Sequence, residues 1–345
     1  MAAFTTVDDS TSFINPKLYT GTGSSLATTG VGFQSDFTWL KNRDQSDFWT
    51  VYDSVRGATK YVKSNADEVE VTNAESLKSF DSDGFTVGTM AEVNTSTENF
   101  VSWNWKMGST TGIGGSPSIT PTAYSFNATA GQSIILWTGT GANATLPHGL
   151  GVAPEFMIVK NLSAVDNWLV YHQSLGNTKY LKLNGTNAAQ TSTAPWNDTS
   201  PTSTLFSIGD STSTNGSGNS LIAYCFAPVQ GYSKFGIYEG WANSDGPFVN
   251  CGFRPAWVLI KGTGNTWDWE GFDNKRKGYN GSGGNKCLQP SNVAAESTED
   301  IDLLSNGFKI RDSGNRMNQT GYDYVYAAFA EQPIANSESV PSNAR

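Results

Sequence analysis

The feature that most limits the fold of this 345-residue chain is a pattern that occurs three times. Each copy has an aromatic residue, three largely apolar residues and a lysine, with a tryptophan eight residues after the lysine. Three residues beyond the tryptophan come an aromatic and then a polar residue. Spacing that is kept without a gap indicates three copies of one structural unit. The segments are FTWLK, FMIVK and WVLIK, ending at Lys41, Lys160 and Lys261, with the tryptophans at Trp49, Trp168 and Trp269.

Further anchors extend each copy. A glycine precedes each lysine by 20 or 21 residues, and a phenylalanine late in each copy precedes a second aromatic residue by the same interval. The decapeptide DSVRGATKYV also returns as HQSLGNTKYL. We therefore divide the chain into an N-terminal arm (1–13), unit 1 (14–108), a Gly/Ser/Thr/Pro-rich linker with a leading strand (109–131), unit 2 (132–229), unit 3 (233–331) and a C-terminal arm (332–345).

The units are expected to consist of β-strands. Short apolar or alternating runs are separated by turn signals such as Asp83-Gly84 and Asn306-Gly307. A composition rich in Gly, Ser, Thr, Asn and aromatic residues favours the same class. The sequence predicts an all-β fold of three tandem β-sandwich, jelly-roll-like repeats. Each repeated lysine is expected where a buried strand leaves the core.

The repeated positions are also the candidate ligand-binding residues. Trp49, Trp168 and Trp269 suit either of two roles, packing in the core of each unit or stacking on a sugar ring. The polar residue four positions later is a candidate ligand contact, and it is Asp53, His172 or Asp273. A shared calcium site is disfavoured because a histidine replaces the carboxylate in unit 2. Core packing is the expected role, because the same offset from a buried strand implies the same place in each hydrophobic core.

The sequence marks no catalytic residue, metal site or cofactor site. It has two histidines, and neither accompanies a nucleophile-elbow motif. Pairs of carboxylates for glycoside cleavage stay open, because their separation is not visible in a sequence. A net charge of -9 without basic clusters argues against nucleic-acid binding. No apolar run is long enough for membrane insertion. The three cysteines form no paired motif and are expected to be free thiols from cytosolic assembly.

The two arms have few apolar residues. ANSESVPSNAR at the C-terminus cannot add to a core, and MAAFTTVDDSTSF at the N-terminus is similar. We expect both arms to be disordered in isolation or to lie against a neighbouring subunit.

Several blocks together carry a family resemblance: LYTGTG, DFTWLKNR, VYDSVRGATKYV, HGLGVAPEFMIVKN, DGPFVNCGFRPAWVLIK and VYAAFAEQP. The chain resembles a domain family of unknown function that is found in virion proteins of marine tailed phages, including those of cyanobacteria. The resemblance covers nearly the whole chain. It implies a concanavalin-like β-sandwich and a role as a tail-fibre, receptor-binding or other structural protein. No catalytic residues come with it.

The expected function is therefore a structural and adhesive virion component, on the tail or decorating the head, and not an enzyme. The partners that this implies are other virion proteins, a host-surface glycan and further copies of the chain, with a trimer favoured. The location is the virion surface after assembly in the bacterial cytoplasm. The alternative is a virion-associated polysaccharide depolymerase on the same scaffold, because fold alone does not decide function.

Overall fold

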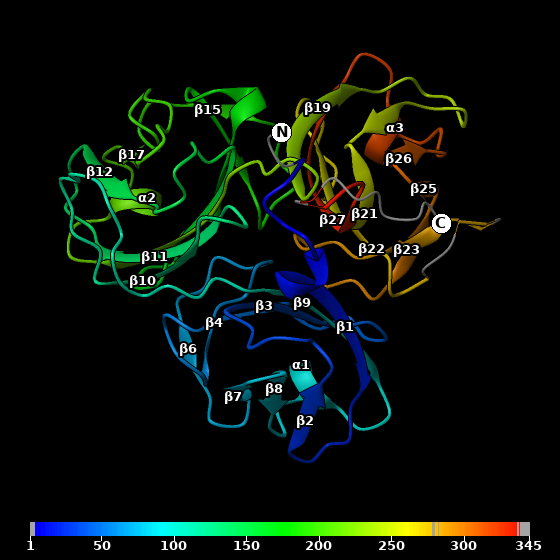
Figure 1. Cartoon of the computed structure of the whole chain (residues 1–345), viewed down its shortest axis with the longest axis horizontal. Coiled ribbons are helices and arrows are strands. Elements are labelled where there is room, and N and C mark those ends of the chain that lie inside the picture. The colour runs from blue at the N-terminus through cyan, green and yellow to red at the C-terminus, as the bar shows by residue number, and fades with distance from the viewer. Residues whose placement is uncertain (1–3, 278–279, 282, 337, 339–345) are drawn as a thin grey trace.

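The computed structural model describes residues 4–277, 280–281, 283–336 and 338, and it confirms the all-β prediction. Three β-sandwiches of antiparallel strands form three lobes around a common centre (Figure 1). Each unit also contains one four-residue helix at an equivalent place, and none has a helical layer among the described residues. No helix in this part of the chain is long and apolar enough to cross a membrane.

Unit 1 follows the short 3₁₀ helix η1 (Ser10–Ser12) and contains nine strands and helix α1. They are β1 (Ile14–Thr20), β2 (Leu26–Thr29), β3 (Phe37–Asn42), β4 (Thr50–Asp53), β5 (Lys60–Tyr61), β6 (Val71–Thr72), β7 (Leu77–Asp81), β8 (Gly84–Val87), α1 (Ala91–Asn94) and β9 (Asn99–Trp105).

Unit 2 begins with a strand contributed by the linker, β10 (Ala123–Asn127), which pairs with β11. Its other elements are β11 (Gln132–Thr138), β12 (Ala144–Pro147), β13 (Phe156–Asn161), β14 (Leu169–His172), η2 (Gln173–Leu175), β15 (Lys179–Lys182), β16 (Gln190–Thr191), β17 (Leu205–Ile208), α2 (Thr212–Asn215) and β18 (Ser220–Phe226).

Unit 3 repeats the order of unit 1. Its elements are β19 (Ser233–Glu239), β20 (Phe248–Asn250), β21 (Phe253–Gly262), β22 (Glu270–Asp273), β23 (Asn285–Cys287), β24 (Ser297–Glu299), β25 (Ile301–Leu304), β26 (Gly307–Ile310), α3 (Asn315–Asn318) and β27 (Asp323–Pro333).

The main sheet has the same strand order in every unit. The first strand of the unit pairs with the last, the last with the third and the third with the fourth, as in β1-β9-β3-β4. In unit 2 the same order occurs in β11-β18-β13-β14, with β10 added beside β11 and with β15 and β16 added beyond β14, and in unit 3 it occurs in β19-β27-β21-β22. The smaller facing sheets are β2-β8-β7, β12-β17 and β20-β26-β25. Figure 1 shows the main sheets toward the centre and the smaller sheets on the outside.

The main sheets are buried on both faces, and the closing strands show how. In β9, Phe100 packs in the sandwich core of unit 1, whereas Val101, Trp103 and Trp105 pack in a core at the centre of the molecule. Because successive side chains of a strand point to opposite faces, one strand serves two cores. Strands β18 and β27 alternate in the same way. The molecule therefore has one hydrophobic core per unit and a fourth core that all three units share.

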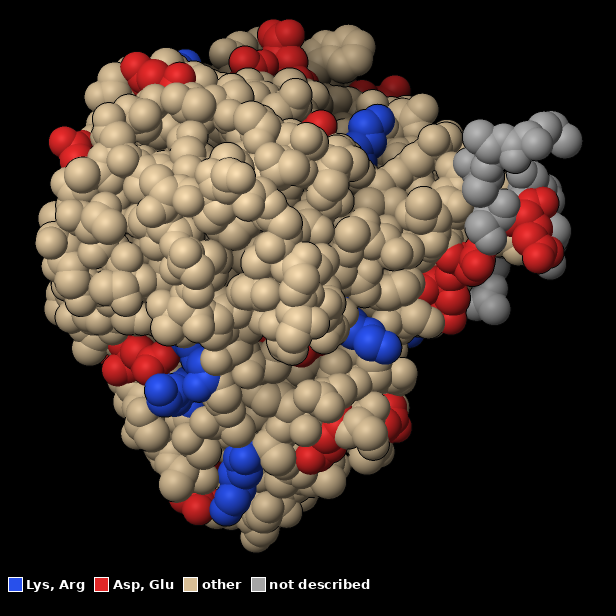
Figure 2. All heavy atoms as spheres, turned by 60° about the vertical axis from the view of Figure 1, so that its left-hand side comes forward, with Lys and Arg blue, Asp and Glu red and all other residues tan. Residues whose placement is uncertain are grey.

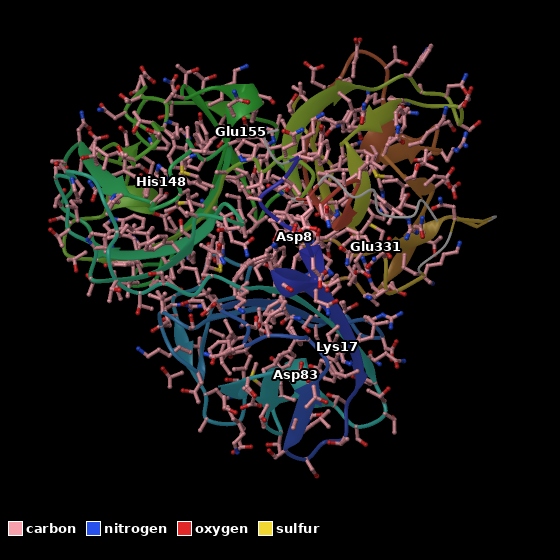
Figure 3. The ribbon with its side chains drawn as sticks, viewed as in Figure 1. Asp8, Lys17, Asp83, His148, Glu155 and Glu331 are labelled. Carbon is pink, nitrogen blue, oxygen red and sulfur yellow. The ribbon has the colours of Figure 1, made fainter. Side chains whose placement is uncertain are left out.

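The N-terminal arm differs from the expectation that it is disordered in isolation or lies against a neighbouring subunit. Val7 is fully buried in the shared central core, and the arm carries Asp8 into the space between the lobes (Figure 3). Thr6 Oγ1 donates to the Thr129 carbonyl at 3.0 Å, and Asp9 accepts from Gln332. A single valine is enough to anchor the arm because the central core offers it an apolar place. The C-terminal arm lies mostly outside the described residues.

Candidate functional site

The three repeated tryptophans lie at the interfaces between units. Each is buried, and each indole N–H donates to a backbone carbonyl of the neighbouring unit. Trp168 of unit 2 donates to unit 1, Trp269 of unit 3 to unit 2, and Trp49 of unit 1 to unit 3, which closes a cycle. The acceptors are the carbonyls of Lys63 at 2.9 Å, Lys182 at 2.8 Å and Gln289 at 2.9 Å. The three units thus form a closed ring with pseudo-threefold symmetry.

Backbone hydrogen bonds repeat the same cycle. At each interface an amide directly before the sixth strand of one unit donates to a carbonyl directly after the third strand of the next unit. The bonds are Glu70 N to Leu162 O (3.0 Å), Ala189 N to Thr263 O (2.7 Å) and Glu296 N to Arg43 O (2.8 Å). Equivalent atoms meet at all three interfaces, so the ring is built into the repeat itself.

The repeated lysines are not at the edge of the core, contrary to expectation. Lys41, Lys160 and Lys261 are fully buried. Lys160 Nζ donates to the Asp67 carbonyl of unit 1 at 2.9 Å, and Lys261 Nζ donates to the Thr186 carbonyl of unit 2 at 3.1 Å. Desolvation lowers the pKa of each lysine to about 8. A lysine tolerates burial here because backbone carbonyls bind its ammonium group.

The two repeated aspartates face the neighbouring unit from the other side of each interface. The Tyr224 hydroxyl of unit 2 donates to Asp53 Oδ2 at 2.7 Å. Trp103 Nε1 of unit 1 donates to Asp273 Oδ2 at 2.9 Å. These donors occupy equivalent positions in β18 and β9. A donor on the adjacent unit therefore binds each buried carboxylate, as its burial requires.

Each aspartate also binds an arginine three residues later. Arg56 Nε lies 2.5 Å from Asp53 Oδ2, and Arg276 Nε lies 2.5 Å from Asp273 Oδ2. Burial by itself raises the pKa of the Asp273 carboxyl, but the Arg276 charge and the Trp103 hydrogen bond hold it below its usual value. This carboxylate is ionised, buried and saturated with donors. It is part of a structural ion pair.

Unit 2 has His172 at this position, and the partner strand explains the exchange. Strand β27 carries Ala327 where the other units have Trp103 and Tyr224, so it offers no side-chain donor. His172 Nε2 lies 3.1 Å from the Tyr326 carbonyl oxygen, which can only accept. Desolvation lowers the pKa of His172 to about 4, so the ring is neutral at pH 7. A neutral donor replaces a carboxylate where the partner is an acceptor.

All six candidate site residues thus lie in contacts between units. The structure brings them together in pairs across the interfaces and does not gather them into one pocket. None of the six presents a surface to a ligand, since their exposed fractions are between 0% and 2%. The burial expected for the tryptophans is observed, whereas an accessible sugar platform at these positions is not.

The second histidine and the three cysteines are also enclosed. His148 lies inside the unit 2 lobe (Figure 3), with Nε2 3.0 Å from the Thr202 carbonyl. Desolvation lowers its pKa to about 4. Burial raises the pKa of every cysteine thiol, which disfavours a reactive thiolate. Within the described residues, no group of three or more His, Cys, Asp or Glu side chains is placed to hold a metal ion.

Glu270 is a buried carboxyl group of β22. It accepts from the Cys287 thiol at 2.8 Å and from Gln289 Nε2 at 2.9 Å. Burial raises its pKa to about 7. Arg316 Nη1 lies 3.8 Å from Glu270 Oε1 and 2.9 Å from Glu299 Oε1, so one guanidinium group lies beside two carboxyl groups. Glu270 is sealed from solvent, however, so a sugar oxygen cannot reach it in this conformation.

A family described as "Domain of unknown function (DUF7483)" matches residues 9–333. The chain belongs to this family. The match covers all three units and the end of the N-terminal arm, so a DUF7483 domain corresponds to the whole ring and not to a single repeat. No curated protein matches the chain.

Two features of this DUF7483 domain do not recur in every unit. A cavity of about 560 Å³ lies where unit 3 meets unit 1, lined by Ile14, Asn15, Arg254, Lys275, Asn306 and Gln332 among others. In unit 3 alone, two tryptophans are exposed, Trp241 at 67% and Trp267 at 38%. The recurring sequence positions identify the residues that build the ring. They do not identify the cavity or the exposed tryptophans, because at these places one copy differs from the others.

Proposed function

We propose that this DUF7483 domain is a non-catalytic structural and adhesive component of a tailed-phage virion. It offers one rigid three-lobed body to neighbouring virion proteins and to host-surface glycans. The virion assignment rests on the sequence resemblance. Support for an adhesive role comes from how the ring uses its repeated residues.

The observation that carries the proposal is the closed cycle of indole hydrogen bonds. The residues that recur with fixed spacing are the ones that join the units, as Trp49, Trp168 and Trp269 do. Selection for a rigid body accounts for their recurrence, whereas three copies of an active site would have kept accessible polar groups. A preorganised body loses little freedom on binding, which favours adhesion.

The surface supports the same proposal. Figure 2 shows a broad area with few Lys, Arg, Asp or Glu side chains on the lobe of unit 2, which lies on the left in Figure 1. A surface of hydroxyl, amide and backbone groups suits contact with uncharged polymers and avoids long-range charge repulsion. The depolymerase alternative finds its best candidate in Glu270 and Glu299, and the burial of Glu270 disfavours it.

The test is to locate the protein in phage particles and to measure adsorption. Gold-labelled antibody against the purified chain should mark the tail or head surface in electron micrographs. Added purified protein should reduce adsorption of the phage to its host. Labelling confined to infected-cell cytoplasm would contradict the proposal. Release of reducing ends from host polysaccharide, lost in Glu270→Gln, would favour the depolymerase. The homotrimer expected from the sequence is measured by light scattering on the same preparation.

A further inference from the structure

We propose that the outer end of unit 3 carries a binding site for a neutral glycan, formed by Trp241 and Trp267, each of which contacts a residue of helix α3. This inference rests on the proposed adhesive function and names its site and ligand class. Four observations support it. The backbone at both tryptophans is the same as in other units, and the Arg316 guanidinium lies over one face of the Trp267 ring. Tyr322 contacts both loops, and nearby charged side chains are in ion pairs.

Trp241 replaces a threonine on an unchanged backbone. Its amide donates to Asn318 Oδ1 of α3 at 2.6 Å. The equivalent amides of Thr22 and Thr140 donate to Asn94 and Asn215 at 2.8 Å in both cases. The fold therefore accepts Thr at this place in two units. An indole with 67% of its surface exposed adds nothing that the fold requires.

Trp267 occupies the place of an aspartate. It stands six residues after Lys261, as Asp166 stands six residues after Lys160. Both backbone carbonyls accept from the lysine Nζ, at 2.6 Å for Trp267 and 2.7 Å for Asp166. The Arg316 guanidinium lies over the Trp267 ring, 5.9 Å from its centroid. One face of the indole is thus supported, which holds the ring in place.

Tyr322 connects the two loops. Its carbonyl accepts from the Gly240 amide at 2.8 Å, directly before Trp241. Its ring lies against Gly264, in the loop that leads to Trp267. Both tryptophans therefore lie at the same end of unit 3, beside a half-buried third aromatic ring.

Arg316 and Asp245, which lie near the two tryptophans, are both in ion pairs, so the geometry favours an uncharged ligand. Arg316 binds Glu299 at 2.9 Å. Asp245, in the loop after Trp241, binds Lys309 at 2.6 Å and Arg311 at 3.3 Å. An indole face packs against the apolar C–H face of a pyranose, while exposed amide groups such as that of Asn243 suit its hydroxyls. A neutral hexose polymer has both groups.

The experiment is calorimetric titration of the full chain with three neutral hexasaccharides: cellohexaose, maltohexaose and mannohexaose. Hexagalacturonate serves as an acidic comparison. The variants Trp241→Thr and Trp267→Asp carry the residues that other units have, so their folding is supported by the chain itself. Thr140→Ala is the matched control in unit 2. Circular dichroism and the melting temperature verify that each variant is folded.

We expect saturable binding of at least one neutral hexasaccharide, weakened about tenfold or more by either tryptophan substitution, as for a Trp hot spot, and unchanged by Thr140→Ala. Binding that survives the double substitution overturns the site, as does preference for hexagalacturonate. No binding of any neutral hexasaccharide also overturns it, while inhibition of phage adsorption by the same protein would leave the proposed function standing. A dimer in light scattering that the double variant abolishes assigns the surface to a second copy instead.

Discussion

Trp168 donates its indole N–H to the backbone carbonyl of Lys63 at 2.9 Å, although 105 residues separate them in the chain. The same bond joins Trp269 to Lys182 and Trp49 to Gln289. The bond from Trp49 to Gln289 joins unit 1 to unit 3. These two units are not consecutive in the chain, yet their interface has the same hydrogen bond as the other two interfaces. The position that recurs most clearly in the sequence is thus the position that closes the ring.

We expect Trp168→Phe to lower the free energy of unfolding by about 1–3 kcal/mol, because the Lys63 carbonyl loses its donor while most of the apolar contact remains. Trp168→Ala should lower it by about 3–5 kcal/mol through the cavity it leaves. Denaturant titration measures both. Trp241→Phe is the control, since that indole is exposed, and it should leave stability nearly unchanged. Equal effects of Phe at positions 168 and 241 would contradict the structural role of the bond.

The shared core predicts that the three units unfold together. Main-sheet residues such as Phe156, Ile158 and Tyr224 pack against other units as well as their own. Calorimetry should therefore show one transition with equal calorimetric and van't Hoff enthalpies. An excised fragment of residues 109–229 should aggregate or stay unfolded, because it exposes this apolar face. Three separate transitions, or a monomeric fragment with its own sharp melt, would show that the units are independent.

Much of the fold follows from the sequence, for identifiable reasons. Turn signals and apolar runs placed the strands, and equal offsets from Lys41, Lys160 and Lys261 placed the three units. The sequence of the last strand of each unit also indicates the central core. IAYCF in β18 is apolar at consecutive positions, whereas a sandwich strand with one solvent-exposed face would alternate apolar and polar residues. Continuous apolar character indicates burial on both faces.

The arrangement of the units and the roles of the candidate site residues did not follow. Asp53 and His172 look like polar ligand contacts in a sequence because their partners lie in another unit. Only the structure shows that Tyr224 faces Asp53 and that the Tyr326 carbonyl faces His172. The burial of Val7 in the N-terminal arm was not predictable either, because one valine among polar residues gives no periodic signal.

His172→Asp should destabilise the protein by about 3 kcal/mol or more, even though units 1 and 3 have aspartate at this place. The new carboxylate would be buried against the Tyr326 carbonyl without a donor, and Leu175 stands where the other units have arginine. Adding Leu175→Arg should restore part of the loss. His172→Asn, which retains an N–H donor, is the control and should cost less than His172→Asp. Thermal melts at pH 7 rank the variants, and an Asp variant as stable as the wild type would contradict this account.

Glu270 gives the stability a pH dependence of known sign. Burial raises its pKa from the ordinary 4.5 to about 7, so between these values the folded protein binds a proton that the unfolded chain releases. Its contribution to stability is full below about pH 4.5 and decreases by up to about 3 kcal/mol as the pH rises to about 7. Glu270→Gln should therefore lose more stability relative to wild type at pH 5 than at pH 7.5.

The control for Glu270→Gln is Glu239→Gln, which removes an exposed carboxyl group of β19. Urea titrations of the wild type and both variants at pH 5 and pH 7.5 isolate the contribution of Glu270. Any effect of histidine titration on stability is the same in all three proteins. A wild-type advantage that grows from pH 5 to pH 7.5 would mean that the Glu270 carboxyl is ionised in the folded protein and that the burial argument is wrong.

The N-terminal arm should be part of the folded body of the free protein. Val7→Ala removes buried methyl groups from the central core and should lower the free energy of unfolding by about 1–2 kcal/mol. Deleting residues 2–9 removes this contact together with the hydrogen bonds of Thr6 and Asp9, and should lower it by about 3 kcal/mol or more. Removing residues 339–345, which lie outside the described residues and have few apolar side chains, is the comparison and should change little. Denaturant titration of the free protein decides, since an arm that orders only on assembly would leave all three variants as stable as the intact chain.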